Sequence, residues 1–80
     1  MNMNLSGVER AILRHLLIRG DDRPINIAEA EGVHRVSVSR SMPDLVEEGL
    51  VIPKGNGVYR LSNDGLIVAR NITDSTGRES

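Results

Sequence analysis

The segment from His34 to Ser41 holds the side chains with the clearest binding chemistry in this 80-residue chain. It contains two arginines, three serines and one histidine, and no acidic residue. An arginine can donate a pair of hydrogen bonds to a guanine edge, whereas serine hydroxyls mostly bind phosphate. Arg35 and Arg40 in this setting therefore favour a surface that binds nucleic acid.

The residues make a much weaker case for catalysis or metal binding. There is no cysteine, and the two histidines, His15 and His34, are too far apart for a metal-ligand spacing. Catalysis needs a pocket with reacting groups in mutual reach, and a chain of this length has little concave volume. We therefore expect a non-enzyme without metal, cofactor or small-molecule ligand. His15 is interpreted as a partly buried structural residue.

Two helices are expected ahead of the basic segment. Ser6 and Glu9 have the spacing of a capping box, and the apolar stripe that follows predicts a helix ending at Gly20. Asn26 is predicted to cap a second, short helix, which Gly32 ends.

The basic segment itself opens a third predicted helix, over residues 34–48. Val38, Met42 and Leu45 fall at i, i+4 and i+7 and should form its buried face. Pro43 lies inside this helix, where its missing amide is expected to kink or split the backbone. The acidic residues of the helix follow Pro43, so charge is sorted along its length.

After this helix the pattern changes to short extended runs. Residues 50–54 and 58–61 are predicted strands, joined by turn chemistry at Gly55-Asn56-Gly57. Pro53 lacks an amide and should therefore place its strand at a sheet edge. The alternation of residues leaves open whether Tyr59 faces the core or the solvent.

Ser62 or Asn63 is expected to cap a last helix that ends at Ile72, followed by a polar, frayed tail over residues 73–80. Apolar residues lie around more than one face of this helix. One side should close the core, and the rest could form the seam of a homodimer. These apolar residues are Leu66, Ile67, Val68, Ala69 and Ile72.

Bulk composition excludes some classes of protein. The formal net charge is −1, with 10 basic and 11 acidic residues, so any nucleic-acid binding must come from the distribution of charge. The sequence lacks an apolar run of the roughly 18 residues that a membrane span requires. Residues 1–4 do not resemble a signal peptide. We therefore expect a cytoplasmic protein that does not engage membranes.

The predicted order of helix, helix, turn, helix, hairpin and helix is that of an α+β winged helix-turn-helix domain over residues 1–72. Such a domain is a three-helix bundle with a β-hairpin wing and a C-terminal helix. Residues 33–51 resemble the recognition helix and first wing strand of winged-helix transcriptional regulators, and residues 24–32 resemble their second helix. The similarity continues over residues 58–65, and its nearest group is MarR-like, in particular archaeal phage-repressor-like proteins.

This resemblance implies a sequence-specific regulator of transcription, a repressor by default, that binds double-stranded DNA. The helix at 34–48 would enter the major groove, and the wing at 53–60 would touch the backbone or the minor groove. The implied DNA-binding residues are His34, Arg35, Val36, Ser37, Ser39, Arg40, Lys54, Asn56 and Arg60.

Another interpretation stays open, because the same fold also serves as a protein-docking module in larger assemblies. The near-neutral net charge and Pro43 favour that alternative. The acid-free segment at 34–41 and the basic wing favour DNA.

Overall fold

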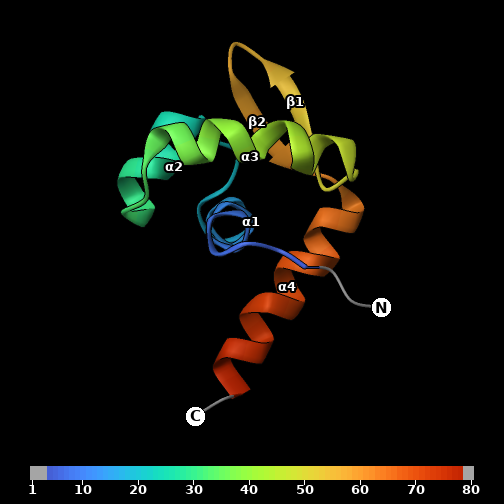
Figure 1. Cartoon of the computed structure of the whole chain (residues 1–80). Helices are drawn as coiled ribbons and strands as arrows, with labels where there is room; N and C mark the ends of the chain where they lie inside the picture. The colour runs from blue at the N-terminus through green and yellow to red at the C-terminus, as the bar shows by residue number, and fades with distance from the viewer. Residues whose placement is uncertain (1–3, 79–80) are drawn as a thin grey trace.

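Residues 4–78 are described by a computed structural model of the chain (Figure 1). Figure 1 looks along helix α1, with α2 and α3 above it, the β-hairpin at the top and α4 below. The order of elements over these residues confirms the predicted α+β architecture. The elements are α1 (Gly7–Arg19), α2 (Pro24–Glu31), α3 (Arg35–Glu47), β1 (Val51–Gly55), β2 (Val58–Leu61) and α4 (Asn63–Arg78).

The first helix begins and ends as its sequence predicts. The Ser6 hydroxyl accepts a hydrogen bond from the Glu9 amide at 3.1 Å, and the Glu9 carboxylate accepts one from the Ser6 amide at 2.9 Å. This reciprocal pair satisfies two amides that the first helical turn leaves without partners. Gly20 ends the helix with a φ of 96°, a backbone conformation that side chains with a Cβ rarely adopt.

The start of α2 corrects the sequence prediction. Its N-cap is Arg23 and its first residue is Pro24, so Asn26 lies inside the helix. Proline suits the first helical position because its φ is preset and its missing amide has no helical partner there. The Asn26 side chain instead donates to the Asp22 carboxylate at 2.9 Å.

The third helix runs unbroken through Pro43, so the predicted split is wrong. Proline removes one hydrogen bond of the helix, and the packing of the buried face on the other side offsets this loss. Val38, Met42 and Leu45 are all buried, as their spacing predicts. Pro43 lies on the exposed face.

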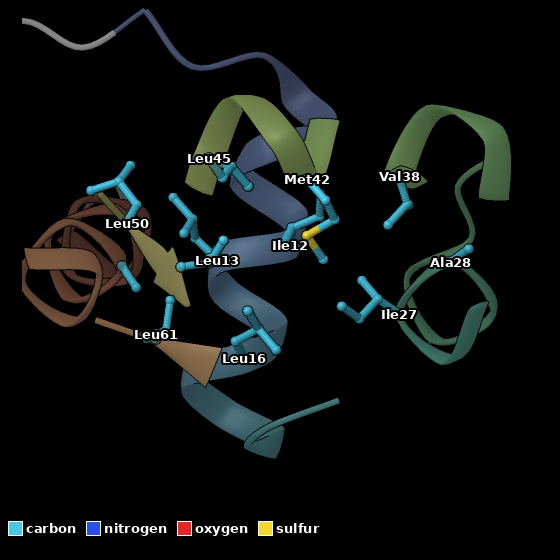
Figure 2. Packing of buried hydrophobic residues seen from close by; sticks show 12 residues of the cluster. Ile12, Leu13, Leu16, Ile27, Ala28, Val38, Met42, Leu45, Leu50 and Leu61 are labelled. Carbon is cyan, nitrogen blue, oxygen red and sulfur yellow. The ribbon is translucent and has the colours of Figure 1, made fainter. Parts of the chain in front are cut away.

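The core is built around α1 (Figure 2). Ile12 and Leu13 are fully buried, and burial of a side chain of this size stabilises a fold by roughly 1.5–3 kcal/mol. The helix packs against α2, α3, α4 and the second strand. The buried cluster consists of Ile12, Leu13, Leu16, Ile27, Ala28, Val38, Met42, Leu45, Leu50, Val51, Leu61 and Ala69.

The hairpin acquires a third extended neighbour from the loop between α1 and α2. Strands β1 and β2 pair antiparallel, with Val51 opposite Leu61, and the connecting Asn56 and Gly57 have φ values of 56° and 78°. On the other side of β2, Asp22 and Tyr59 exchange backbone hydrogen bonds of 3.1 and 2.9 Å. Strand β1, with Pro53, is therefore at the edge in this part of the chain, as predicted.

Helix α4 is capped by Ser62, whose hydroxyl accepts from the Gly65 amide at 2.9 Å. The helix continues to Arg78, well beyond residue 72, where the sequence pattern predicted its end. Once a helix has formed, each further residue adds one backbone hydrogen bond, so extension is easier than initiation. Thr73 adds a further bond, from its hydroxyl to the Ala69 carbonyl at 3.0 Å. Residues 79–80 of the expected tail and residues 1–3 lie outside the described part. No helix within residues 4–78 is long and apolar enough to cross a membrane.

Candidate functional site

An open hollow of about 520 Å³ lies where the start of α2, the outer face of α3 and the tip of the hairpin meet. Its charge comes entirely from three arginines, which alternate with apolar and small residues. The hollow therefore combines a cationic rim with an apolar surface. The lining residues are Arg23, Pro24, Ile25, Arg35, Val36, Ser39, Arg40 and Gly57.

The predicted residues of α3 divide into two groups. Arg35, Val36, Ser39 and Arg40 are exposed and line the hollow together, because residues three and four apart share one helix face. Ser37 is half-buried, and its carbonyl accepts a hydrogen bond from the Ser41 hydroxyl at 2.9 Å.

The acidic residues of α3 are kept apart from the hollow. Asp44, Glu47 and Glu48 are exposed at the end of α3, whereas the hollow lies against its first two turns. His34 is exposed at the N-cap of the same helix. The charge sorting that the sequence indicates is therefore also a sorting in space, although the net charge of the chain is close to zero.

The wing residues Lys54, Asn56 and Arg60 are all exposed, but they lie outside the set that lines the hollow. The Lys54 ammonium pairs with the Asp21 carboxylate at 2.8 Å, and both side chains remain about half exposed. An exposed pair of this kind contributes only about 0–1 kcal/mol. A phosphate group can therefore compete with Asp21 for Lys54.

Arg23 is a site residue that sequence reasoning missed. It stands at the N-cap of α2, lines the hollow and donates from Nε to the Asn56 carbonyl at 3.1 Å. This bond ties the hairpin tip to the start of α2. Pro24 could have indicated this role, because proline is common at the first position of a helix. Reading Pro24 as the first helical residue places Arg23 at the helix start and not in a polar turn.

His15, on α1, is a buried polar residue that bridges two carboxylates. Its side chain contacts Asp22 through Nε2 at 2.8 Å and Glu31 through Nδ1 at 2.9 Å. Each ring nitrogen therefore has a carboxylate oxygen within hydrogen-bond distance, one from the loop before α2 and one from the last residue of α2. The prediction of a structural histidine is confirmed, and its 2 % exposure is lower than expected.

Asp22 links His15 to the hairpin and to α2. Burial raises the pKa of Asp22, but hydrogen bonds from His15 and Asn26 act against burial and lower it. The Arg23 amide and the attraction of His15 lower it further, so the pKa lies below the usual value. The Asp22 carboxylate is therefore ionised at neutral pH. The backbone of the same residue forms hydrogen bonds with the backbone of Tyr59.

The described residues do not offer a metal centre. In this part of the chain, no group of three or more His, Cys, Asp or Glu side chains is arranged to hold a metal ion. The carboxylates around His15 are engaged with its two ring nitrogens, which are the atoms that would otherwise bind a metal.

Helices α2 and α3, the short turn between them, the hairpin beside them and α1 behind them define a winged helix-turn-helix fold. The same fold is found in NMB1585, a MarR family regulator from Neisseria meningitidis, with a TM-score of 0.82 and 22% identity. That match covers 94% of this chain and 57% of the other.

Two further solved structures are similar. Ligand-free NadR matches with a TM-score of 0.83 and 20% identity, over 94% of this chain and 56% of its own. Wild-type ZitR from Lactococcus lactis matches with a TM-score of 0.80 and 21% identity, over 99% of this chain and 60% of its own. This chain thus spans about three-fifths of the length of the solved proteins it resembles. No family model and no curated protein matches the sequence.

Proposed function

We propose that this chain is a sequence-specific double-stranded DNA-binding regulator of transcription. The observation that carries the proposal is the cationic hollow over the first two turns of α3, at the position where a helix-turn-helix presents its second helix. A helix about 10–12 Å across fits a major groove about 12 Å wide. Arg35 and Arg40 would then meet base edges, and Ser39 and His34 the adjoining backbone.

The hairpin supplies the second contact in this proposal. Lys54, Asn56 and Arg60 are exposed, and Arg23 holds the hairpin tip beside the start of α2. We propose that these wing residues contact the DNA backbone or the minor groove, with Lys54 exchanging Asp21 for a phosphate. Because the tip is tied to α2, the wing and α3 would approach DNA as one unit.

Within this class we propose repression. A protein seated in the major groove excludes other proteins from the same stretch of DNA, which by itself blocks a promoter. In vitro transcription from a promoter that overlaps a selected binding site would distinguish repression from activation. Added protein should lower the transcript yield.

We further propose that the chain acts as a homodimer through α4. Ile67 is 57% exposed on this helix, with the exposed Leu66 beside it. A two-fold dimer would present two α3 helices about 34–36 Å apart, the spacing of successive major grooves on one side of the duplex. One module alone buries only about 600–1,000 Å² on DNA, which limits its affinity.

The dimer predicts that Ile67→Glu yields a monomer. Sedimentation equilibrium over a range of concentrations should show wild type as a dimer and the variant as a monomer, because a charge in the seam would lose its water. Ile18→Glu is the matched control, since Ile18 on α1 is an isoleucine that is also more than half exposed, at 67%. A wild type that stays monomeric at every concentration, or a control that dissociates as readily, would contradict the α4 seam.

The DNA-binding proposal predicts that Arg35→Ala/Arg40→Ala binds DNA at least about 30-fold more weakly than wild type, because a good bidentate contact is worth about 1–3 kcal/mol. The logarithmic salt slope should stay close to that of wild type, since the slope counts phosphate contacts at about 0.9 each and these two arginines are proposed to contact base edges. The measurement is fluorescence anisotropy of a labelled duplex, titrated with protein at several salt concentrations. Circular dichroism would first confirm that the variants fold.

The matched control is Arg10→Ala/Arg19→Ala. It removes the same charge from two exposed positions on α1, outside the hollow. This control should keep most of the affinity and most of the salt slope. If wild type fails to bind any duplex at low salt, or if both double variants bind equally well, α3 is not a recognition helix. The protein-docking alternative would then lead.

A further inference from the structure

The hollow contains an apolar patch between its arginines. Val36 is 50% exposed on α3 and Ile25 is 44% exposed on α2, and both line the hollow together with Pro24. Single exposed apolar residues are common on protein surfaces. Here two of them, from two helices, meet in one hollow beside the half-buried Pro24, with Arg35 and Arg40 at its edge.

This patch lies outside the packing of the fold. Val36 and Ile25 belong neither to the buried cluster nor to the partly buried residues packed against it. Valine is also a poorer helix former than alanine, so folding gains nothing from Val36 at an exposed helix position. Ligand recognition therefore accounts for an apolar side chain here better than stability does.

Among the edges that bases present in the major groove, thymine carries the one apolar group, its C5 methyl. Guanine presents the two acceptors that suit an arginine. Arg40 follows Val36 by one helical turn, which is about 6 Å along the helix axis, and base pairs are stacked about 3.4 Å apart. The arginine and the valine on this face can thus reach bases about two steps apart.

We propose that Val36 is a specificity-determining residue that recognises a thymine methyl, with Ile25 and Pro24 excluding water around it. This inference rests on the proposed DNA-binding function and adds its sequence preference. The expected site contains a thymine within about two base steps of a guanine that Arg40 or Arg35 contacts.

The test removes one methyl group from the DNA and nothing else. Binding sites are first selected from a random duplex pool with wild-type protein. Each thymine of a selected duplex is then replaced, one at a time, by deoxyuridine, and the Kd is measured by anisotropy. At one position in each protein-binding half-site, the substitution should weaken wild type about fourfold, the effect of one buried methyl.

The Val36→Ala variant should bind the thymine duplex about as weakly as wild type binds the deoxyuridine duplex, or more weakly, and should be insensitive to deoxyuridine at that position. Val36→Thr keeps one of the methyl groups and should retain part of the discrimination. Ile18→Ala is the control: it truncates an exposed isoleucine away from the hollow and should keep the full deoxyuridine effect. Thermal unfolding of Val36→Ala should match that of wild type.

Two results would overturn the inference while leaving the DNA-binding function in place. One is that the protein selects and binds a duplex, but no single deoxyuridine changes its affinity. The other is that Val36→Ala shows the same deoxyuridine effect as wild type. If no duplex is bound or enriched at all, the proposed function itself fails, and the thymine preference fails with it.

Discussion

Replacing Gly65 with alanine is expected to lower the free energy of unfolding by about 3 kcal/mol, the upper end of the usual cost of overpacking and a large share of the roughly 4–12 kcal/mol that stabilises a domain of 80 residues. A Cβ at this position would stand 1.9 Å from the Leu50 carbonyl oxygen and 2.9 Å from its carbon. The obstacle is backbone, and the Ser62 amide holds that carbonyl by a hydrogen bond of 3.0 Å. The clash can be relieved only by moving α4 away from the residue that precedes β1.

Urea denaturation followed by circular dichroism would measure this effect. Gly7→Ala is the matched control, because it adds the same methyl to a helical glycine near the start of α1, where the new Cβ would have no neighbour within 4 Å apart from the adjoining residues and the backbone of its own helix. The control should be unchanged or more stable by up to about 1 kcal/mol, since alanine restricts the unfolded chain. Equal midpoints for the two variants would mean that α4 does not approach Leu50 this closely in solution.

His15→Ala is expected to destabilise the fold by about 2–4 kcal/mol. The change leaves a cavity in a site that is 2 % exposed, and it leaves two carboxylates without the group that bridges them. Breaking a fully buried ion pair costs about 3–5 kcal/mol. The cost should be lower here because the side chains of Asp22 and Glu31 keep 25% and 21% of their surface exposed.

Chemical denaturation of His15→Ala against His34→Ala would test this expectation, since His34 is the other histidine and is exposed. The His34 variant should stay within about 0.5 kcal/mol of wild type. A cycle with Glu31→Gln would isolate the charge interaction, because alanine at position 15 should cost less once Glu31 is neutral. If His15→Ala were as stable as wild type, the bridge would contribute nothing to the fold.

The bridge also matters for the proposed DNA contact. Asp22 binds His15 with its side chain and Tyr59 with its backbone, while Arg23, the next residue, holds the hairpin tip through Asn56. His15, the wing and the start of α2 are therefore connected through two adjacent residues, Asp22 and Arg23. Loss of His15 should loosen the wing relative to α3, in addition to its effect on stability.

Local signals in the sequence were enough for most element ends and for the buried face of α3. The Ser6–Glu9 capping box, the Asn56-Gly57 turn and the Val38, Met42, Leu45 spacing each predict what the structure contains. Each signal depends on residues within seven positions of one another, and at that separation the local backbone geometry decides which residues are in contact or share a face. The α+β order of elements and the placement of the basic segment on an exposed helix face follow from them.

Contacts between distant residues were beyond such reasoning. His15 meets Glu31 across 16 positions, and Arg23 meets Asn56 across 33. Only the packing of α1, α2 and the hairpin brings these pairs together, so no periodicity in the sequence predicts them. The same holds for Pro43, which α3 tolerates because its opposite face is buried, and for Gly65, whose need for a bare backbone comes from Leu50. The sequence alone therefore determined the elements and the chemistry of α3, whereas tertiary packing decided how the wing, α2 and α3 are held as one surface.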